Sequence, residues 1–285
     1  ALFGQVKGGK KAGVLLRVNS RRGAASSQFR VDRVSFLHAG KGIEFGGDSY
    51  INSDCSTFID CGFGHLDVGV HTLSDQNVGY LFLRPGFGWC KTAMWFQEGG
   101  IVDCITPLTH HIDTIIRIDK GGINAGTFRF TQLHAEQGSH TNRPRRYVVL
   151  QARGEATIEM QGLRTNTWGL FGPEADFETP MFDLSDGAHV LVTGSHLTGR
   201  IAKLAGRKKA TPTWIAFQNC RFRCSEDPRA MACPDGTGYR LRDCSVAIDD
   251  TRGEKYRILE SLFVPDLVRY PGLAAGQPEG PPAAP

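Results

Sequence analysis

Short runs of alternating apolar and polar residues follow one another along most of the chain, separated by glycines and other turn residues. Two examples are IRID (116–119) and FRF (128–130), which lie on either side of the glycine pair GG (121–122). Successive side chains of a β-strand point to opposite faces, so a period of two predicts strands with one buried face. The 35 glycines favour many turns over long helices. We therefore expect an all-β fold.

The strand-like runs recur at intervals of about 23–33 residues, which indicates an internal repeat. A first set of apolar markers is Phe29, Phe58, Phe82, Ile105, Phe128, Ile158, Leu191, Ile215 and Tyr239. A second set consists of apolar pairs: Ile43/Phe45, Val70/Thr72, Met94/Phe96, Ile116/Ile118, Val148/Leu150 and Phe182/Leu184. The unit is too short for a propeller blade and lacks the leucine-rich consensus. It predicts a coil of parallel strands with one unit per turn.

In unit length and strand phasing, residues 14–250 resemble the right-handed parallel β-helix proteins of the pectate-lyase-like superfamily. The resemblance implies a right-handed single-stranded parallel β-helix, here of roughly nine to ten rungs, and does not by itself assign a function. We expect this domain to span residues 1–253. Residues 254–270 are predicted to form a short helical cap, and the Pro/Gly/Ala-rich tail 271–285 is predicted to be disordered. Nothing before Val14 looks like a cover for the open N-terminal end, which suggests a processed or excised N-terminus.

If each apolar pair of the second set points inward, the residue between its members points outward. The outward positions are then Glu44, His71, Trp95, Arg117, Val149 and Asp183, with Leu73, Gln97, Asp119, Gln151 and Ser185 alongside. Adjacent turns lie about 4.8 Å apart, so these side chains should form one patch. An outward Trp among polar groups suits a sugar ring. The alternative is an ordinary solvated strand face with one exposed Trp.

Three long segments between predicted strands, 134–147, 164–181 and 198–214, should meet at one corner of the coil. They are basic and partly aromatic, and include Arg145, Arg146 and Trp168. Such a wall suits an extended anionic chain, most simply an acidic polysaccharide. The predicted substrate-binding residues are Glu44, Trp95, Gln97, Gln151, Asp183, Arg145, Arg146 and Trp168.

Two reactions fit such a surface. A lyase would use Arg117, or a bound Ca²⁺, to neutralise a uronate carboxylate, and His71 or Lys120 as base. A hydrolase would use Asp119 with Glu98 or Glu44 as its carboxylate pair. The rival hypothesis is a non-catalytic glycan-binding or structural module, tail-spike-like or from a surface protein, because no strict catalytic signature is present. We therefore expect a secreted, cell-surface or virion protein, and leave a homotrimer or larger assembly open.

Net charge and hydropathy exclude few classes of binding partner. The net charge of +4 is too small to argue for nucleic acid alone, and no apolar run approaches the roughly 18–20 residues of a membrane span. Most of the eight cysteines sit beside apolar strand residues, which predicts buried free thiols. A Cys224–Cys233 disulfide stays open, and the cysteine spacing predicts no metal site.

Overall fold

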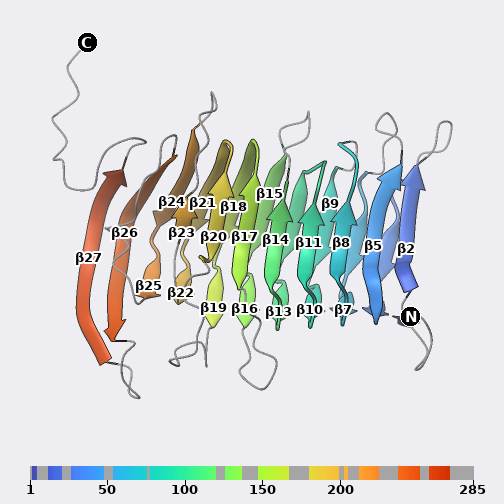
Figure 1. Cartoon of the computed structure of the whole chain (residues 1–285), viewed down its shortest axis with the longest axis horizontal. Helices are drawn as coiled ribbons and strands as arrows, with labels where there is room; N and C mark the ends of the chain where they lie inside the picture. The colour runs from blue at the N-terminus through green and yellow to red at the C-terminus, as the bar shows by residue number, and fades with distance from the viewer. Residues whose placement is uncertain are drawn as a thin grey trace, which may run out of the picture.

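The protein is a coil of short β-strands in the computed structural model. The structure describes residues 2–4, 12–20, 27–47, 54–75, 78–119, 126–136, 147–166, 180–198, 202–204, 212–224, 237–250 and 257–269. Within these ranges every regular element is a strand. Figure 1 shows the strands side by side along the longest axis, from the blue N-terminal turns to the red C-terminal hairpin. The predicted all-β parallel solenoid is confirmed.

Each turn contributes one strand to each of three sides, and strands of one side pair in parallel from turn to turn. Side 1 is an eight-stranded sheet of β2 (Ala12–Ser20), β5 (Ala39–Gly47), β8 (Val68–Thr72), β11 (Thr92–Phe96), β14 (Thr114–Ile118), β17 (Val148–Arg153), β20 (Phe182–Ser185) and β23 (Ala202–Leu204). Side 2 consists of β3 (Arg30–Asp32), β6 (Thr57–Ile59), β9 (Tyr80–Leu83), β12 (Val102–Ile105), β15 (Thr127–Thr131), β18 (Ala156–Gln161), β21 (Ala188–Thr193) and β24 (Thr213–Gln218).

Side 3 is built from the shortest strands. It consists of β1 (Leu2–Gly4), β4 (Ser35–Leu37), β7 (Gly62–Gly64), β10 (Gly86–Gly88), β13 (Leu108–His110), β16 (His134–Glu136), β19 (Arg164–Asn166), β22 (His196–Thr198) and β25 (Arg221–Cys224). Sides 2 and 3 belong to one 19-stranded sheet, because the long strand β26 (Thr237–Asp250) pairs with β24 and then with β25. Sides 1 and 2 have eight strands each in the described part of the chain, so the predicted nine to ten rungs are not confirmed. The right-handed winding stays a prediction.

In the N-terminal turns, the corner between sides 2 and 3 is made by non-glycine residues with left-handed backbone. Arg33, Asp60 and Arg84 have φ of 53°, 52° and 50°. Such a conformation costs roughly 1–3 kcal/mol at each non-glycine residue unless its surroundings hold it. Here the N–H of each corner residue donates to the next turn: that of Asp60 to the Leu83 carbonyl at 2.9 Å, and that of Arg84 to the Ile105 carbonyl at 2.8 Å. The sharp bend is therefore repeated without losing backbone hydrogen bonds.

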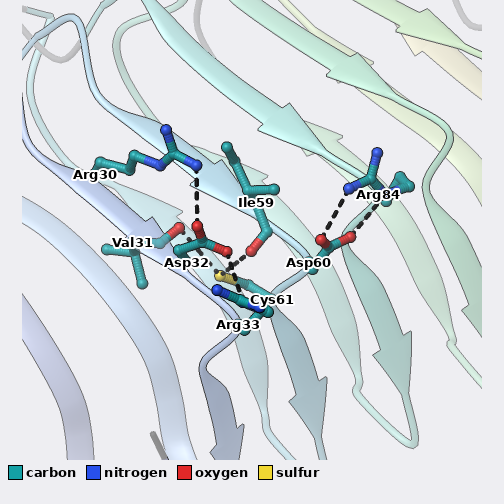
Figure 2. Close-up of polar contacts among 8 residues, drawn as sticks. All are labelled: Arg30, Val31, Asp32, Arg33, Ile59, Asp60, Cys61 and Arg84. Atoms are coloured by element: carbon teal, nitrogen blue, oxygen red, sulfur yellow. Dashed lines mark hydrogen bonds and ion pairs between the residues drawn. The ribbon is translucent and has the colours of Figure 1, made fainter.

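Side chains at this corner link successive turns as well. Arg84 donates to the two carboxylate oxygens of Asp60 at 2.7 and 2.8 Å, as Figure 2 shows. One turn earlier, Arg30 and Arg33 both contact the Asp32 carboxylate. The Arg84 guanidinium lowers the pKa of Asp60. Cations and carboxylates thus alternate at this corner, and each positive charge has a negative neighbour.

The interior is filled by ladders of aromatic rings. Phe36, Phe63 and Phe87 stack in successive turns with centroids 5.1 and 4.7 Å apart. Phe58 and Phe82 form a second stack at 4.8 Å. Six cysteine side chains are also buried, as predicted: Cys61, Cys90, Cys104, Cys220, Cys224 and Cys244. Cys55 is exposed, and Cys233 lies outside the described residues.

The predicted C-terminal helix is wrong. Residues 257–269 form a strand, β27 (Arg257–Arg269), which pairs antiparallel with β26 and has a register shift at Ile248/Asp249. Val264 on β27 is buried, whereas its neighbour Phe263 is exposed, which is the alternation of a strand. At the other end, pairing begins before Val14, because β1 pairs with β4 and β2 starts at Ala12. Residues 271–285 lie outside the described residues.

Several predicted positions shift in the observed register. Phe82 pairs with Cys104, one residue before the marker Ile105, and Ile158 pairs with Val190, one residue before the marker Leu191. The third long segment, 198–214, contains the side-1 strand β23, and the other two begin with the side-3 strands β16 and β19. These strands were missed because each has only three residues.

Candidate functional site

The predicted polar column on side 1 exists. Parallel pairing aligns Arg17, Glu44, His71, Trp95, Arg117, Gln151 and Asp183 in successive turns. Their strand neighbours Ile43, Phe45, Met94 and Phe96 lie in the core, so the column is on the opposite, outer face of the sheet. We refer to these seven residues as the side-1 column. The sequence pattern therefore identified the face and most of the members.

One member of the predicted column is wrong. Arg117 pairs with Gln151 rather than with Val149, and Val149 is fully buried. The strand β17 starts with three successive buried residues, Val148 to Leu150, so its outward position comes two residues later than the apolar pair suggested. Gln151 therefore belongs to the first outward column, and Arg153 takes the place alongside it.

At the N-terminal end of the column, Glu44 is a buried carboxylate surrounded by cations. Although it lies on the outer face, it is only 3% exposed. It forms ion pairs with Arg17 at 2.7 Å and with Lys41. Burial raises the pKa of Glu44, but the hydrogen bond and charge of Lys41 and the charge of Arg17 outweigh it, and the net shift is downward. Sequence analysis missed both Arg17 and Lys41, although Arg17 lies between apolar residues in the run LLRVNS.

His71 connects this ionic cluster to the aromatic part of the column. Its Nδ1 lies 3.4 Å from Glu44 Oε2, and the side chain is almost completely buried. Burial, together with the charge of Lys41, lowers the pKa of His71, against the opposing effect of Glu44. The Gln97 side chain also favours the charged imidazole, but Nε2 has no partner at hydrogen-bonding geometry among the described residues. His71 is therefore a neutral ring at pH 7.

Trp95 is held between two side chains of its own column. The His71 ring stacks on it with centroids 4.4 Å apart, and the Arg117 guanidinium carbon lies 4.2 Å from its centroid. His71 and Arg117 come from the turns on either side, so both faces of the indole are covered. The indole N–H donates to Asp119 at 2.7 Å. A sugar ring could stack on Trp95 only if Arg117 moved away.

Asp119 joins the indole to the guanidinium. It accepts hydrogen bonds from Arg117 Nε at 2.8 Å and Nη2 at 3.1 Å, in addition to that from Trp95. Arg117 and Asp119 are partly exposed, with 37% and 23% of their side chains accessible. These three residues form a rigid polar surface that solvent reaches, in contrast to the buried Glu44 and His71.

The C-terminal end of the column is a second charge network. Asp183 accepts hydrogen bonds from Gln151 at 2.9 Å and from Arg153 at 2.7 Å. Arg153 also donates to the Ser185 hydroxyl at 3.0 Å. Arg153 was not predicted, because the register error at Val149 hid it. Asp183 is nearly buried, so this network braces the sheet more than it presents a ligand surface.

The remaining predicted site residues do not belong to the side-1 column. Gln97 and Glu98 follow β11 and are partly buried, and the Glu98 carbonyl accepts a hydrogen bond from Thr72 at 2.7 Å. Lys120, Arg145, Arg146 and Trp168 lie outside the described residues. The described residues contain no cluster of three or more potential metal ligands. They also contain no helix long and apolar enough to cross a membrane.

Comparison with protein-family models, curated proteins and solved structures gives no match. The solenoid architecture rests on the structure itself, and membership of the pectate-lyase-like superfamily stays a prediction.

Proposed function

We propose that the protein is a glycan-binding β-solenoid whose ligand, an extended and acidic polysaccharide, lies along the outer face of side 1. The observation that supports the proposal is the alignment of Trp95, Arg117 and Asp119 in a partly exposed, internally fixed surface. Groups held in place before binding lose little entropy when a ligand arrives. Turns about 4.8 Å apart present these groups in line with the coil axis, which suits a linear chain.

Recognition in this proposal relies on hydrogen bonds and charge, since both faces of Trp95 are covered. Arg117 has further N–H groups beyond those that bond Asp119, and Gln97 stands in the neighbouring position. A uronate carboxylate can accept from the guanidinium while the hydroxyls of the sugar meet Gln97. Such a binding function fits the expected secreted, cell-surface or virion location and membership of a larger assembly.

Binding is tested with a panel of immobilised acidic and neutral glycans. Replacing Arg117 with Ala should weaken binding of the acidic ligand at least about tenfold, because a hydrogen bond to a charged group is worth about 1.5–3 kcal/mol. Arg240→Ala is the matched control, since Arg240 is a partly exposed arginine paired with Asp266 in the C-terminal hairpin. Equal affinity of Arg117→Ala and wild type, with both folded by circular dichroism, would remove side 1 as the binding surface.

Cleavage of the glycan is the second candidate function. The observation in its favour is that His71, Arg117 and Asp119 come together within neighbouring turns, as the lyase and hydrolase hypotheses require. Against it, the Asp119 carboxylate is already bonded to Arg117 and Trp95, and His71 is buried. Incubation with uronic-acid polymers, with and without Ca²⁺, followed by ultraviolet absorbance and a reducing-end assay, decides between cleavage and binding.

A further inference from the structure

A row of exposed basic side chains runs along side 3, away from the side-1 column. Parallel pairing aligns His134 with Arg164, Arg164 with His196, and His196 with Arg221. All four side chains are exposed. The next residue along each strand points inward and is buried, as Ala135 and Leu197 show. Side 3 therefore presents four basic residues in a straight line, about 4.8 Å from turn to turn. We refer to these four residues as the side-3 row.

Among the described residues, no member of the row forms an ion pair with a carboxylate. Several other exposed arginines do: Arg84 with Asp60, Arg129 with Asp103 and Glu159, and Arg240 with Asp266. Within the described part of the chain, neither Arg164 nor Arg221 forms an ion pair. Within the described side-3 strands the one carboxylate is that of Glu136, two residues after His134 on β16. The positive charge of the row is therefore concentrated at Arg164 and Arg221, which flank His196.

Like charges this close repel one another, by roughly 1 kcal/mol at 4 Å in water. The effect is visible on His196, whose pKa is lowered first by partial burial and then by the charges of Arg221 and Arg164. An arrangement that costs free energy in the free protein becomes favourable when an anion neutralises it. A ligand with a negative charge at each repeat would remove the repulsion along the whole row.

Beyond the row, the same column on side 3 has one exposed side chain, Leu108, followed by two glycines. The column continues from His134 through Leu108 to Gly86 and Gly62. A Cβ added at Gly86 would meet no atom within 4 Å, and one at Gly62 would meet only the Ser35 hydroxyl oxygen, at 3.5 Å. A linear molecule bound at the row would pass the exposed Leu108 and then lie over the glycine positions, where no side chain stands in its path.

We propose that the side-3 row is an anion-binding track for a stiff acidic polysaccharide, distinct from the surface on side 1. A stiff chain with one carboxylate or sulfate per sugar keeps its charges in line, which matches a straight row of cations. Single-stranded nucleic acid fits less well, because such sites interleave cations with aromatic faces on which the bases stack. Side-3 strands carry no exposed Phe, Tyr or Trp among the residues whose burial is described. The half-exposed Trp89 lies outside the row, at the adjoining corner, where its ring stacks on His65 and His111.

The test uses the full chain with polygalacturonate as the probe, at low and moderate salt. The double variant Arg164→Ala/Arg221→Ala should lose at least about tenfold in affinity and show a weaker dependence on salt. The matched control is Arg84→Ala/Arg240→Ala, which removes the same charge from exposed arginines that already have aspartate partners. This control should bind nearly as tightly as wild type.

Three results would overturn the proposal. The first is equal loss of affinity in the two double variants, which would mean that only net charge matters. The second is wild-type affinity in Arg164→Ala/Arg221→Ala. The third is tighter binding of a single-stranded polynucleotide than of polygalacturonate at equal salt, which would assign the track to nucleic acid. Arg117→Ala serves to separate the two surfaces: it should leave the loss caused by the side-3 double variant unchanged in size.

Discussion

His71 has the predicted position on the outer face of its strand, but it is far more buried than the pattern suggests. Strand alternation placed it on the outer face, and the register confirms that position. Alternation alone does not indicate how deeply an outward residue is buried, since this depends on neighbours from other turns. Here Glu44 and Trp95 lie against the ring, and His71 is 2% exposed. The sequence could therefore predict the direction of the side chain but not its environment.

The lowered pKa of His71 predicts a loss of stability in acid. The unfolded chain takes up a proton near the ordinary pKa of 6.5, whereas the folded protein does so only at lower pH. Stability should therefore fall as the pH drops below about 6.5. Urea unfolding at pH 7.5 and 5.5 should show a larger drop for wild type than for His71→Asn. Some drop remains in the variant, because His65, His110 and His196 also have lowered pKa values.

The control for this experiment is His134→Asn, which replaces an exposed histidine on side 3. It should keep the pH dependence of the wild type. If His71→Asn and the wild type lose the same free energy of unfolding between the two pH values, His71 does not stay neutral in the folded protein.

Elements were predictable where a strand carries two inward apolar residues. The pairs Ile43/Phe45 and Met94/Phe96 located side-1 strands correctly. The strand β23, with the sequence AKL, is too short to show a period, and its pairing with β20 only becomes evident in three dimensions. The C-terminal hairpin was misread for a different reason. Leu259, Leu262 and Phe263 have a spacing that a helix also permits, and the pairing with β26 decides the outcome.

The strand assignment of β27 makes a prediction for two neighbouring residues. Val264 is 6% exposed and Phe263 is 64% exposed. Val264→Ala removes two buried carbon atoms at about 0.8 kcal/mol each, so it should reduce the free energy of unfolding by about 1–2 kcal/mol. Phe263→Ala, although it removes a larger side chain, should change it by less than about 0.5 kcal/mol. A larger effect at Phe263 in urea unfolding would contradict the strand.

The whole molecule is a stack in which each turn pairs only with the turns beside it. The sequence predicted this architecture, because the repeat length excluded other repeat folds. It did not predict side 3, whose three-residue strands have one inward residue each, such as Phe63 or Ala135. That is too little for a period of two. The side-3 row therefore stayed hidden, while the longer strands of side 1 revealed their column.

A stack of this kind predicts where substitutions interact. Phe58 and Phe82 are in contact in adjacent turns, whereas Phe217 lies on β24, many turns away. In double-mutant cycles of Phe→Leu substitutions, Phe58 and Phe82 should show a coupling of about 0.5–1.5 kcal/mol. Phe58 and Phe217 should be additive within about 0.3–0.5 kcal/mol. Strong coupling between Phe58 and Phe217 would contradict this expectation, because it would mean that substitutions in distant turns affect one another.

The antiparallel direction of β27 affects how a strand of another chain could add to the C-terminal edge of the sheet. Every earlier ladder of the described residues runs in parallel, whereas β27 pairs antiparallel with β26. The antiparallel β27 ends that series and presents Pro265 opposite Asp243, at the bend of β26. Proline lacks an amide hydrogen and interrupts the row of donors that an incoming strand would need. An incoming strand would therefore find one donor missing from the outer edge of β27, which makes this edge a poorer template for the growth of a fibril.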